Sequence, residues 1–364
     1  MTGLRRAAAL GLVVTLGFAV IAVLLAFLQG IDQIGPGFAA FFEGIAGSGT
    51  SIASTIRYFT PILLISVSAS VSIRAGLFDV GQVGQYVVGG LFAAAVGSAM
   101  HGPGIVVATA ALLCGAAAGG GWAWLVGRLS EAIKVQLVVL SLIANSFADG
   151  LVKFITRTLL QDPEAFSVVA TRALPRDAWL PVLVPRTSLH LGVAVAVVIA
   201  IAVWAVVRFT TVGHRLTMFG RNPRFAAVVG VDANRYPLRV LLCSGAVAGL
   251  AGAIEVLGVY HRFQDGTLGG SNSIAWTGLT AAILIPAGLL AMLPASLFLA
   301  ALTTGLAGVQ RDIGITSGLG TLVQGLLIVI AAVALTERVS RPKPRKTRPP
   351  APATAVLEPE LRNG

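Results

Sequence analysis

The chain has 364 residues, of which 56% are hydrophobic and 11% charged, and its mean hydropathy is +0.87. This composition excludes an ordinary soluble globular protein. The net charge of +11 would favour nucleic-acid binding in a soluble protein. Here the basic residues lie between and beyond long apolar segments, so a role on nucleic acid is not expected.

Apolar segments long enough to cross a bilayer, at about 20 residues each, recur along the whole chain. Their abundant glycines, 43 in the chain, suit close contact between membrane helices. The sequence therefore predicts an all-α, polytopic membrane helix bundle with about ten transmembrane helices. The ten candidates are residues 7–28, 53–73, 80–99, 104–126, 135–156, 189–208, 238–258, 273–292, 294–309 and 318–336.

The distribution of Lys and Arg predicts the orientation of this bundle. If the N-terminus is cytoplasmic, ten spans return the C-terminus to the same side, and the cytoplasmic segments hold 18 of the 26 basic residues. The positive-inside rule favours that arrangement. Residues 1–337 then form the transmembrane domain, with an external loop at 157–188, a cytoplasmic loop at 209–237 and a basic, Pro-rich cytoplasmic tail at 338–364 that lacks the apolar content to fold.

Metal and disulfide chemistry have no support in the sequence. Cys114 and Cys243 lie far apart in apolar segments and form no CxxC pattern, and the four histidines show no paired spacing. No cofactor and no catalytic residue is expected.

The stretch "GRNPRFAAVVGVDANR", residues 220–235, is unusually polar for this chain. Asn222 is a favourable helix N-cap, and Pro223 follows at the first helical position, where its missing N–H costs nothing. Gly230 is placed to end the helix in the left-handed conformation. The pattern predicts a helix of about seven residues, which is too short to be stable alone in water and must pack on something. An ordinary capped turn between two spans is the alternative.

The longer segment "GHRLTMFGRNPRFAAVVGVDANRYPLRVLLCSGAVAGLAGAIEVLGV", residues 213–259, resembles the cytoplasmic loop and following helix of permease subunits of ATP-binding-cassette (ABC) importers, in the branch for simple sugars and nucleosides. In that family this loop carries a coupling helix that contacts the ATPase subunit. The resemblance implies ATPase coupling by Gly220, Arg221, Asn222, Pro223, Ala226, Ala227 and Gly230.

Other segments extend the resemblance over roughly residues 50–335. They are "IRAGLFDVGQVGQYVVGG" at 73–90, "LVVLSLIANSF" at 137–147 and, more weakly, "GGSNSIAWTGLTAAILIPAG" at 269–288. The chain departs from the family pattern at Asp79 and Val83, where the family has Asn and Glu. These departures lie where a pathway would run, so the family's usual substrate does not carry over automatically.

Polar residues inside the apolar segments are candidates for the substrate pathway, because polar groups are costly in a bilayer. The candidates are Gln82, Gln85, Ser141, Asn145, Asp149 and Trp276. For each of them a structural role remains open: hydrogen bonds between helices for the amides, packing for Trp276, and mutual neutralisation with Lys153 for Asp149. Glu255 is expected near the outer end of its span, where hydration by interfacial water is an alternative. The Gly245-x-x-x-Gly249 spacing predicts a close contact between helices.

None of the four lysines follows a glycine, so the chain has no phosphate-binding G-x-x-x-x-G-K motif and cannot itself hydrolyse ATP. The resemblance implies an inner-membrane protein that is not an enzyme and that works with a separate ATPase subunit, a second permease subunit and an extracytoplasmic substrate-binding lipoprotein. Nucleosides or simple sugars are the expected small-molecule substrates. The alternative is a stand-alone ion-coupled secondary transporter, for which Asp149 is the candidate carboxylate.

Overall fold

The computed structural model describes residues 34–165, 168–270, 273–284 and 288–314, together with residues 30, 32, 322, 325 and 326. The first predicted span, 7–28, and the predicted tail, 338–364, lie outside the described residues. The last predicted span, 318–336, is described at only three positions.

Helices make up almost all of the regular structure in the described residues, and this confirms the all-α prediction. The described residues between 159 and 191 form no long helix or strand: they contain isolated β-bridges and one 3₁₀ turn, η2, at Arg176–Ala178, and we call them the irregular segment. In chain order the α-helices are α2 (Ile34–Ala46), α3 (Gly49–Arg74), α4 (Gln82–Ala99), α5 (Gly104–Ile133), α6 (Leu137–Thr158), α7 (Gly192–Phe209), α8 (Thr211–Arg221), α9 (Pro223–Val228), α10 (Arg235–Glu255), α11 (Ile274–Leu284) and α12 (Met292–Ile313). A π-helical turn, η3 (Val256–Tyr260), extends α10, and a 3₁₀ turn, η4 (Leu289–Ala291), precedes α12.

Six helices in the described residues are long and apolar enough to cross a membrane, so the expected ten spans are not confirmed. These are Gly49–Arg74, Gly104–Ile133, Leu137–Thr158, Gly192–Phe209, Arg235–Tyr260 and Leu289–Ile313. The segment expected to span at 273–292 instead forms the 11-residue α11 followed by η4. At 1.5 Å per residue α11 covers about 16 Å, roughly half of a bilayer core. The stretch between the first two predicted spans, residues 29–52, contains the 13-residue α2.

Helices α3 and α10 form the centre of the bundle. In the span that contains α3, 78% of the most apolar stretch is buried, and the corresponding share is 72% for α10 with η3. Helix α10 packs against α3, α4 and α5, whereas α12 packs against α2 and α3. The same share is only 17% for α7, which packs against α3 at the periphery of the bundle.

Glycines bring α10 into backbone contact with its neighbours, as the Gly245-x-x-x-Gly249 spacing predicted. A Cβ atom added to Gly249 would lie 2.4 Å from the carbonyl oxygen of Gly115 on α5. One added to Gly89 on α4 would lie 2.3 Å from the carbonyl oxygen of Gly249. Any side chain at these positions would push the helices apart.

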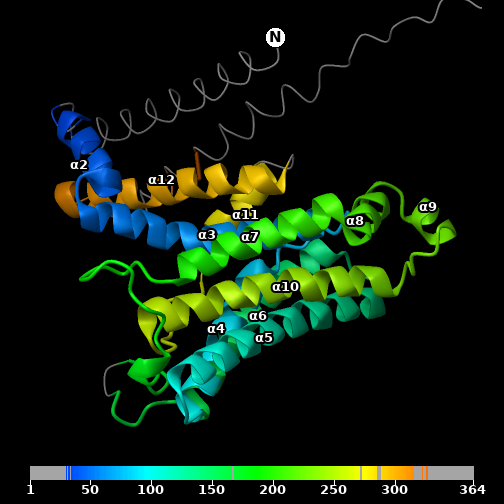
Figure 1. The fold of residues 1–364 in the computed structure, drawn as a ribbon, viewed down its shortest axis with the longest axis horizontal. Coiled ribbons are helices and arrows are strands. Elements are labelled where there is room, and N and C mark those ends of the chain that lie inside the picture. The colour runs from blue at the N-terminus through cyan, green and yellow to red at the C-terminus, as the bar shows by residue number, and fades with distance from the viewer. Residues whose placement is uncertain are drawn as a thin grey trace, which may run out of the picture.

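The two ends of the bundle are built differently. Figure 1 shows α9 projecting at one end of the long axis, with α8 leading to it, and the described parts of the irregular segment at the opposite end. Helix α10 follows α9 in the chain and is extended by η3, which contacts the irregular segment. It therefore connects the two ends.

Candidate functional site

Helix α9 forms because its caps are encoded locally. The Asn222 side-chain oxygen accepts a hydrogen bond from the Phe225 N–H at 3.0 Å, and Pro223 occupies the first helical position. At the other end Gly230 has φ +91°, and the Val231 N–H donates to the Ala226 carbonyl. The predicted short capped helix is confirmed with six residues.

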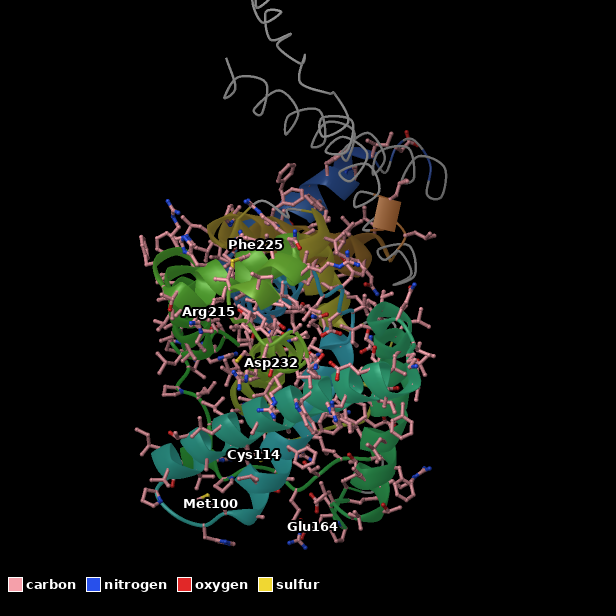
Figure 2. The ribbon with its side chains drawn as sticks, turned by 90° about the vertical axis from the view of Figure 1, so that its right-hand side faces the viewer. Met100, Cys114, Glu164, Arg215, Phe225 and Asp232 are labelled. Carbon is pink, nitrogen blue, oxygen red and sulfur yellow. The ribbon has the colours of Figure 1, made fainter. Side chains whose placement is uncertain are left out.

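One face of α9 packs on the protein and the other is exposed. Ala226 is fully buried against Phe219 and Val231. The side chains of Phe225, Val228 and Val229, by contrast, are 54%, 84% and 59% exposed. Figure 2, which looks onto this end of the molecule, shows Phe225 on the surface of the bundle. An exposed apolar surface on so short a helix is typical of a contact site for another molecule.

Helix α8, which the sequence did not predict, fixes α9 to the membrane bundle. A Cβ atom on Gly220 would lie 2.0 Å from the Arg74 carbonyl oxygen, so the backbones of α8 and α3 touch at this point. Leu216 packs with Ala75 and Val240 in a small apolar cluster. Helix α9 is therefore connected to α3 through α8.

The loop after α9 leads straight into α10. The Asp232 carboxylate accepts hydrogen bonds from the backbone N–H groups of Asn234 and Arg235, at 3.0 and 3.2 Å. These two hydrogen bonds lower the pKa of Asp232, and the one from the Arg235 N–H has the larger effect. This carboxylate therefore stays ionised at neutral pH and stabilises the first turn of α10.

Four of the sequence-predicted pathway residues gather where α4 begins. Gln82 and Gln85 are buried, and their side-chain amides donate to the Asp79 carboxylate, at 3.5 and 2.8 Å. The carbonyl oxygens of both glutamines have no hydrogen-bond partner among the described residues. Asn145 lies next to this group, because its side chain bonds to the Gly84 N–H and to the Val80 carbonyl, each at 2.9 Å.

Asn145 and Ser141, both on α6, satisfy the backbone at the irregular start of α4. The Ser141 hydroxyl accepts from the Val80 N–H at 3.2 Å. Backbone groups at a helix start have no partner within the helix, and a lipid-facing bundle cannot supply water to them. These two residues thus hold α4 in place, and only the glutamines present free polar atoms.

The other two predicted pathway residues lie apart from this group. Asp149 forms an ion pair with Lys153 at 3.0 Å, as the i,i+4 spacing indicated, and Lys153 also approaches Asp265 at 3.7 Å. Trp276 is half-buried against Ala69 and Leu279, and its indole N–H donates to the Gly270 carbonyl.

A buried ion pair between Arg57 on α3 and Glu255 on α10 is the principal feature that the sequence did not predict. The Arg57 side chain donates to the Glu255 carboxylate, and their side chains are only 9% and 2% exposed. The Arg57 guanidinium also stacks over the Tyr58 ring, 4.4 Å from its centroid. The pair joins the two central helices at the end of the bundle opposite to α9.

Several buried polar atoms in the region of this pair have no hydrogen-bond partner among the described residues. They are Arg57 Nε, Glu255 Oε2, Tyr86 Oη and His190 Nε2. Burial, with a smaller effect of the Arg57 charge, lowers the pKa of His190 to about 4. His190 is therefore neutral at pH 7, in keeping with its Nδ1 accepting from the Gly192 N–H.

The irregular segment 159–191 covers this end of α10. The Leu180 N–H donates to the Leu257 carbonyl at 3.1 Å, and the Leu174 N–H donates to the His261 carbonyl at 2.8 Å. Trp179 stacks on His261 with ring centroids 3.6 Å apart. The π-helical turn is thus held by contacts to a segment far from it in the sequence.

These features define a multi-pass membrane protein with a projecting contact helix at one end and a covered, charge-paired opposite end. Residues 51–332 match the family model described as the branched-chain amino acid transport system / permease component. The chain belongs to this family of membrane permease components.

Relatives that are named as ABC transporter permeases indicate which branch of the family the chain resembles. The guanosine ABC transporter permease protein NupP of Bacillus subtilis is 28% identical over 315 residues, which cover 86% of this chain and 90% of that protein. The nucleoside ABC transporter permease protein NupB of Lactococcus lactis is 24% identical, over 84% and 86% of the two chains. The glucose ABC transporter permease protein TsgB13 of Haloferax volcanii is 27% identical, over 74% and 72%. No match was found among solved structures.

The chain is therefore an ABC transporter permease of the nucleoside and sugar branch, and it is not an enzyme. The family implies ATPase and substrate-binding partners. The resemblance found in the sequence is confirmed.

Proposed function

We propose that this protein forms the translocation pathway of an importer for a nucleoside or simple sugar, driven by a separate ATPase subunit that docks on α9. The observation that carries this proposal is the projecting α9, whose exposed Phe225, Val228 and Val229 lie on a helix that is joined through α8 to α3 and through Asp232 to α10. The names of the similar permeases support the substrate class.

In this proposal α8 and α9 lie in the cytoplasm, both chain termini are cytoplasmic, and the protein resides in the inner membrane. The six basic residues between 208 and 239 support that orientation. A second permease subunit completes the transmembrane unit, and an extracytoplasmic lipoprotein delivers the substrate to the opposite end.

The free carbonyl oxygens of Gln82 and Gln85 are proposed to face the solute on its way through the bundle. They accept hydrogen bonds, as the hydroxyl groups of a ribose or hexose require. In this proposal Ser141 and Asn145 act by positioning α4. Asp149 and Trp276 lie apart from the group at the start of α4. The stand-alone transporter gains no support, since its candidate carboxylate Asp149 is paired with Lys153.

The proposed docking is tested with Val228→Asp, which places a charge on the most exposed apolar side chain of α9. We expect the affinity for the ATPase subunit to fall at least tenfold, because a buried interface position does not tolerate an unpaired charge. Co-purification of the two subunits from membranes gives the measurement. Leu183→Asp, at an apolar position that is 47% exposed in the segment at the opposite end, is the control and should retain the ATPase.

Equal recovery of the ATPase with both variants would overturn the docking proposal. Reconstitution tests the energy source separately. Uptake of labelled guanosine, uridine or glucose into vesicles should require ATP, the ATPase subunit and the binding protein. Uptake by the permease alone would overturn the ABC mechanism.

A further inference from the structure

A groove of about 690 Å³ opens beside α8, between the ends of α3 and α7 and the turn η4. Its walls combine two kinds of side chain. Arg74, Arg208 and Arg221 supply guanidinium groups, and Trp204, Val207 and Leu289 supply an apolar surface. No Asp or Glu is among the described residues that line it.

Two other arginines at the same end of the bundle have carboxylate partners. Arg128 pairs with Glu131 at 3.1 Å, and Arg235 pairs with Asp232 at 3.6 Å. Within the part of the chain that the structure describes, Arg74, Arg208 and Arg221 form no ion pair. Three unpaired guanidinium groups around one groove attract an anion, and arginine is suited to phosphate because it donates two parallel hydrogen bonds.

The apolar wall continues onto a lipid-facing surface. Helix α7 contributes Trp204 and Val207, and on the same helix Val198, Ile201 and Phe209 are exposed. A free phosphate ion has no use for this wall, and an acidic protein surface would not extend along a helix facing the membrane core. A molecule with both a phosphate group and acyl chains fits both walls.

We propose that this groove binds the headgroup of an anionic glycerophospholipid, with the phosphate among Arg74, Arg208 and Arg221 and an acyl chain along α7. Basic pockets between membrane helices at the cytoplasmic surface are suited to such headgroups. The groove is also lined by Asn222, the N-cap of α9, and by Phe225 on α9. A bound lipid would therefore touch α8 and α9 as well as the helix bundle, whatever solute the protein carries.

Tryptophan quenching by brominated lipid tests the site in the full-length protein. The protein is placed in phosphatidylcholine nanodiscs that contain a small fraction of lipid with brominated acyl chains, as either phosphatidylglycerol or phosphatidylcholine. Trp204 lines the groove, so the signal that Trp204→Phe removes reports on it. We expect at least a tenfold preference for brominated phosphatidylglycerol at Trp204, with about a fivefold reduction in Arg208→Gln and a further reduction towards no preference in the double variant.

The test variants are Arg208→Gln and the double variant Arg74→Gln with Arg208→Gln. Arg128→Gln is the matched control, because Arg128 lies on α5 outside the groove and has its own carboxylate partner. If the double variant does not fold, Arg208→Gln alone decides, since the Arg208 side chain is exposed and its loss leaves the helix packing intact.

Two results would overturn the proposal. One is equal quenching by the two brominated lipids, or an equal loss of preference in Arg208→Gln and Arg128→Gln. The other is displacement of the preference by inorganic phosphate at constant ionic strength, which would identify a free-anion site. Displacement by unbrominated phosphatidylglycerol, with no effect of inorganic phosphate, is the supporting result.

Discussion

The two ends of α10 differ in what holds them. At one end Asp232 stabilises the first turn of the helix, and the neighbouring α9 leaves Phe225 and Val228 exposed. At the other end Glu255 is buried in an ion pair with Arg57 and lies under the irregular segment. One end therefore leaves an apolar helix surface exposed, whereas at the other a buried charge pair fixes two helices together.

The largest effect should come from Glu255→Gln, which leaves the Arg57 charge buried without its carboxylate. We expect a loss of about 3–5 kcal/mol in unfolding free energy, because an uncompensated buried charge is strongly destabilising. Chemical denaturation of the purified protein in detergent measures it. Glu131→Gln, which breaks the exposed pair with Arg128, should cost less than about 1 kcal/mol.

The double variant Arg57→Met with Glu255→Met sharpens this result. It removes both charges and should recover most of the lost stability. If Glu255→Gln proved as stable as Glu131→Gln, the stability of this end of the bundle would not depend on the ion pair, and the contrast between the two ends would fail.

A smaller effect is expected at the opposite end from Gly220→Ala. The new methyl group would lie 2.0 Å from the Arg74 carbonyl oxygen, so α8 must move away from α3. Overpacking of this kind costs about 1–3 kcal/mol. The temperature of thermal unfolding should fall, and the proposed association with the ATPase subunit should weaken.

Gly121→Ala on α5 is the matched control, because a Cβ there meets nothing within 4 Å. Alanine at such a helical position should be neutral or slightly stabilising. Equal behaviour of the two alanine variants would show that α8 is not seated on α3.

The smallest effect should come from Asn222→Ala, which removes the cap of α9. Loss of an N-cap side chain costs about 1 kcal/mol, and α9 is exposed and short, so global stability should change little. We expect instead a loss of α9 order, seen as faster hydrogen exchange at the Phe225 amide. Asn222→Asp keeps an oxygen acceptor and should preserve protection. Unchanged exchange in Asn222→Ala would mean that packing of Ala226 alone holds α9.

Helix α9 could be predicted from the sequence because its signals are local. Asn222, Pro223 and Gly230 each specify a backbone conformation by their own chemistry, and all three adopt it. Helix α8 was missed because its sequence is polar and gains stability only when Gly220 and Leu216 meet α3 and α10.

Contacts between distant segments could not be predicted in the same way. Arg57 and Glu255 are 198 positions apart, and nothing near either residue indicates its partner. Asn145 was recognised as a polar residue in a span, but its bonds to the Val80 and Gly84 backbone depend on where α4 starts. The expected span at 273–292 is not confirmed, since within the described residues it is represented by the 11-residue α11 and the turn η4, and apolar composition alone does not indicate helix length.

The glycine contacts of α10 have a mechanical consequence. Where Gly249 meets Gly115 and Gly89, backbone touches backbone, with no flexible side chains between them to absorb a displacement. Three rods in such contact cannot slip past one another by small side-chain adjustments. A pull applied at the beginning of α10 is therefore shared with α4 and α5, and the load is carried by a stiff three-helix block rather than by a single lever.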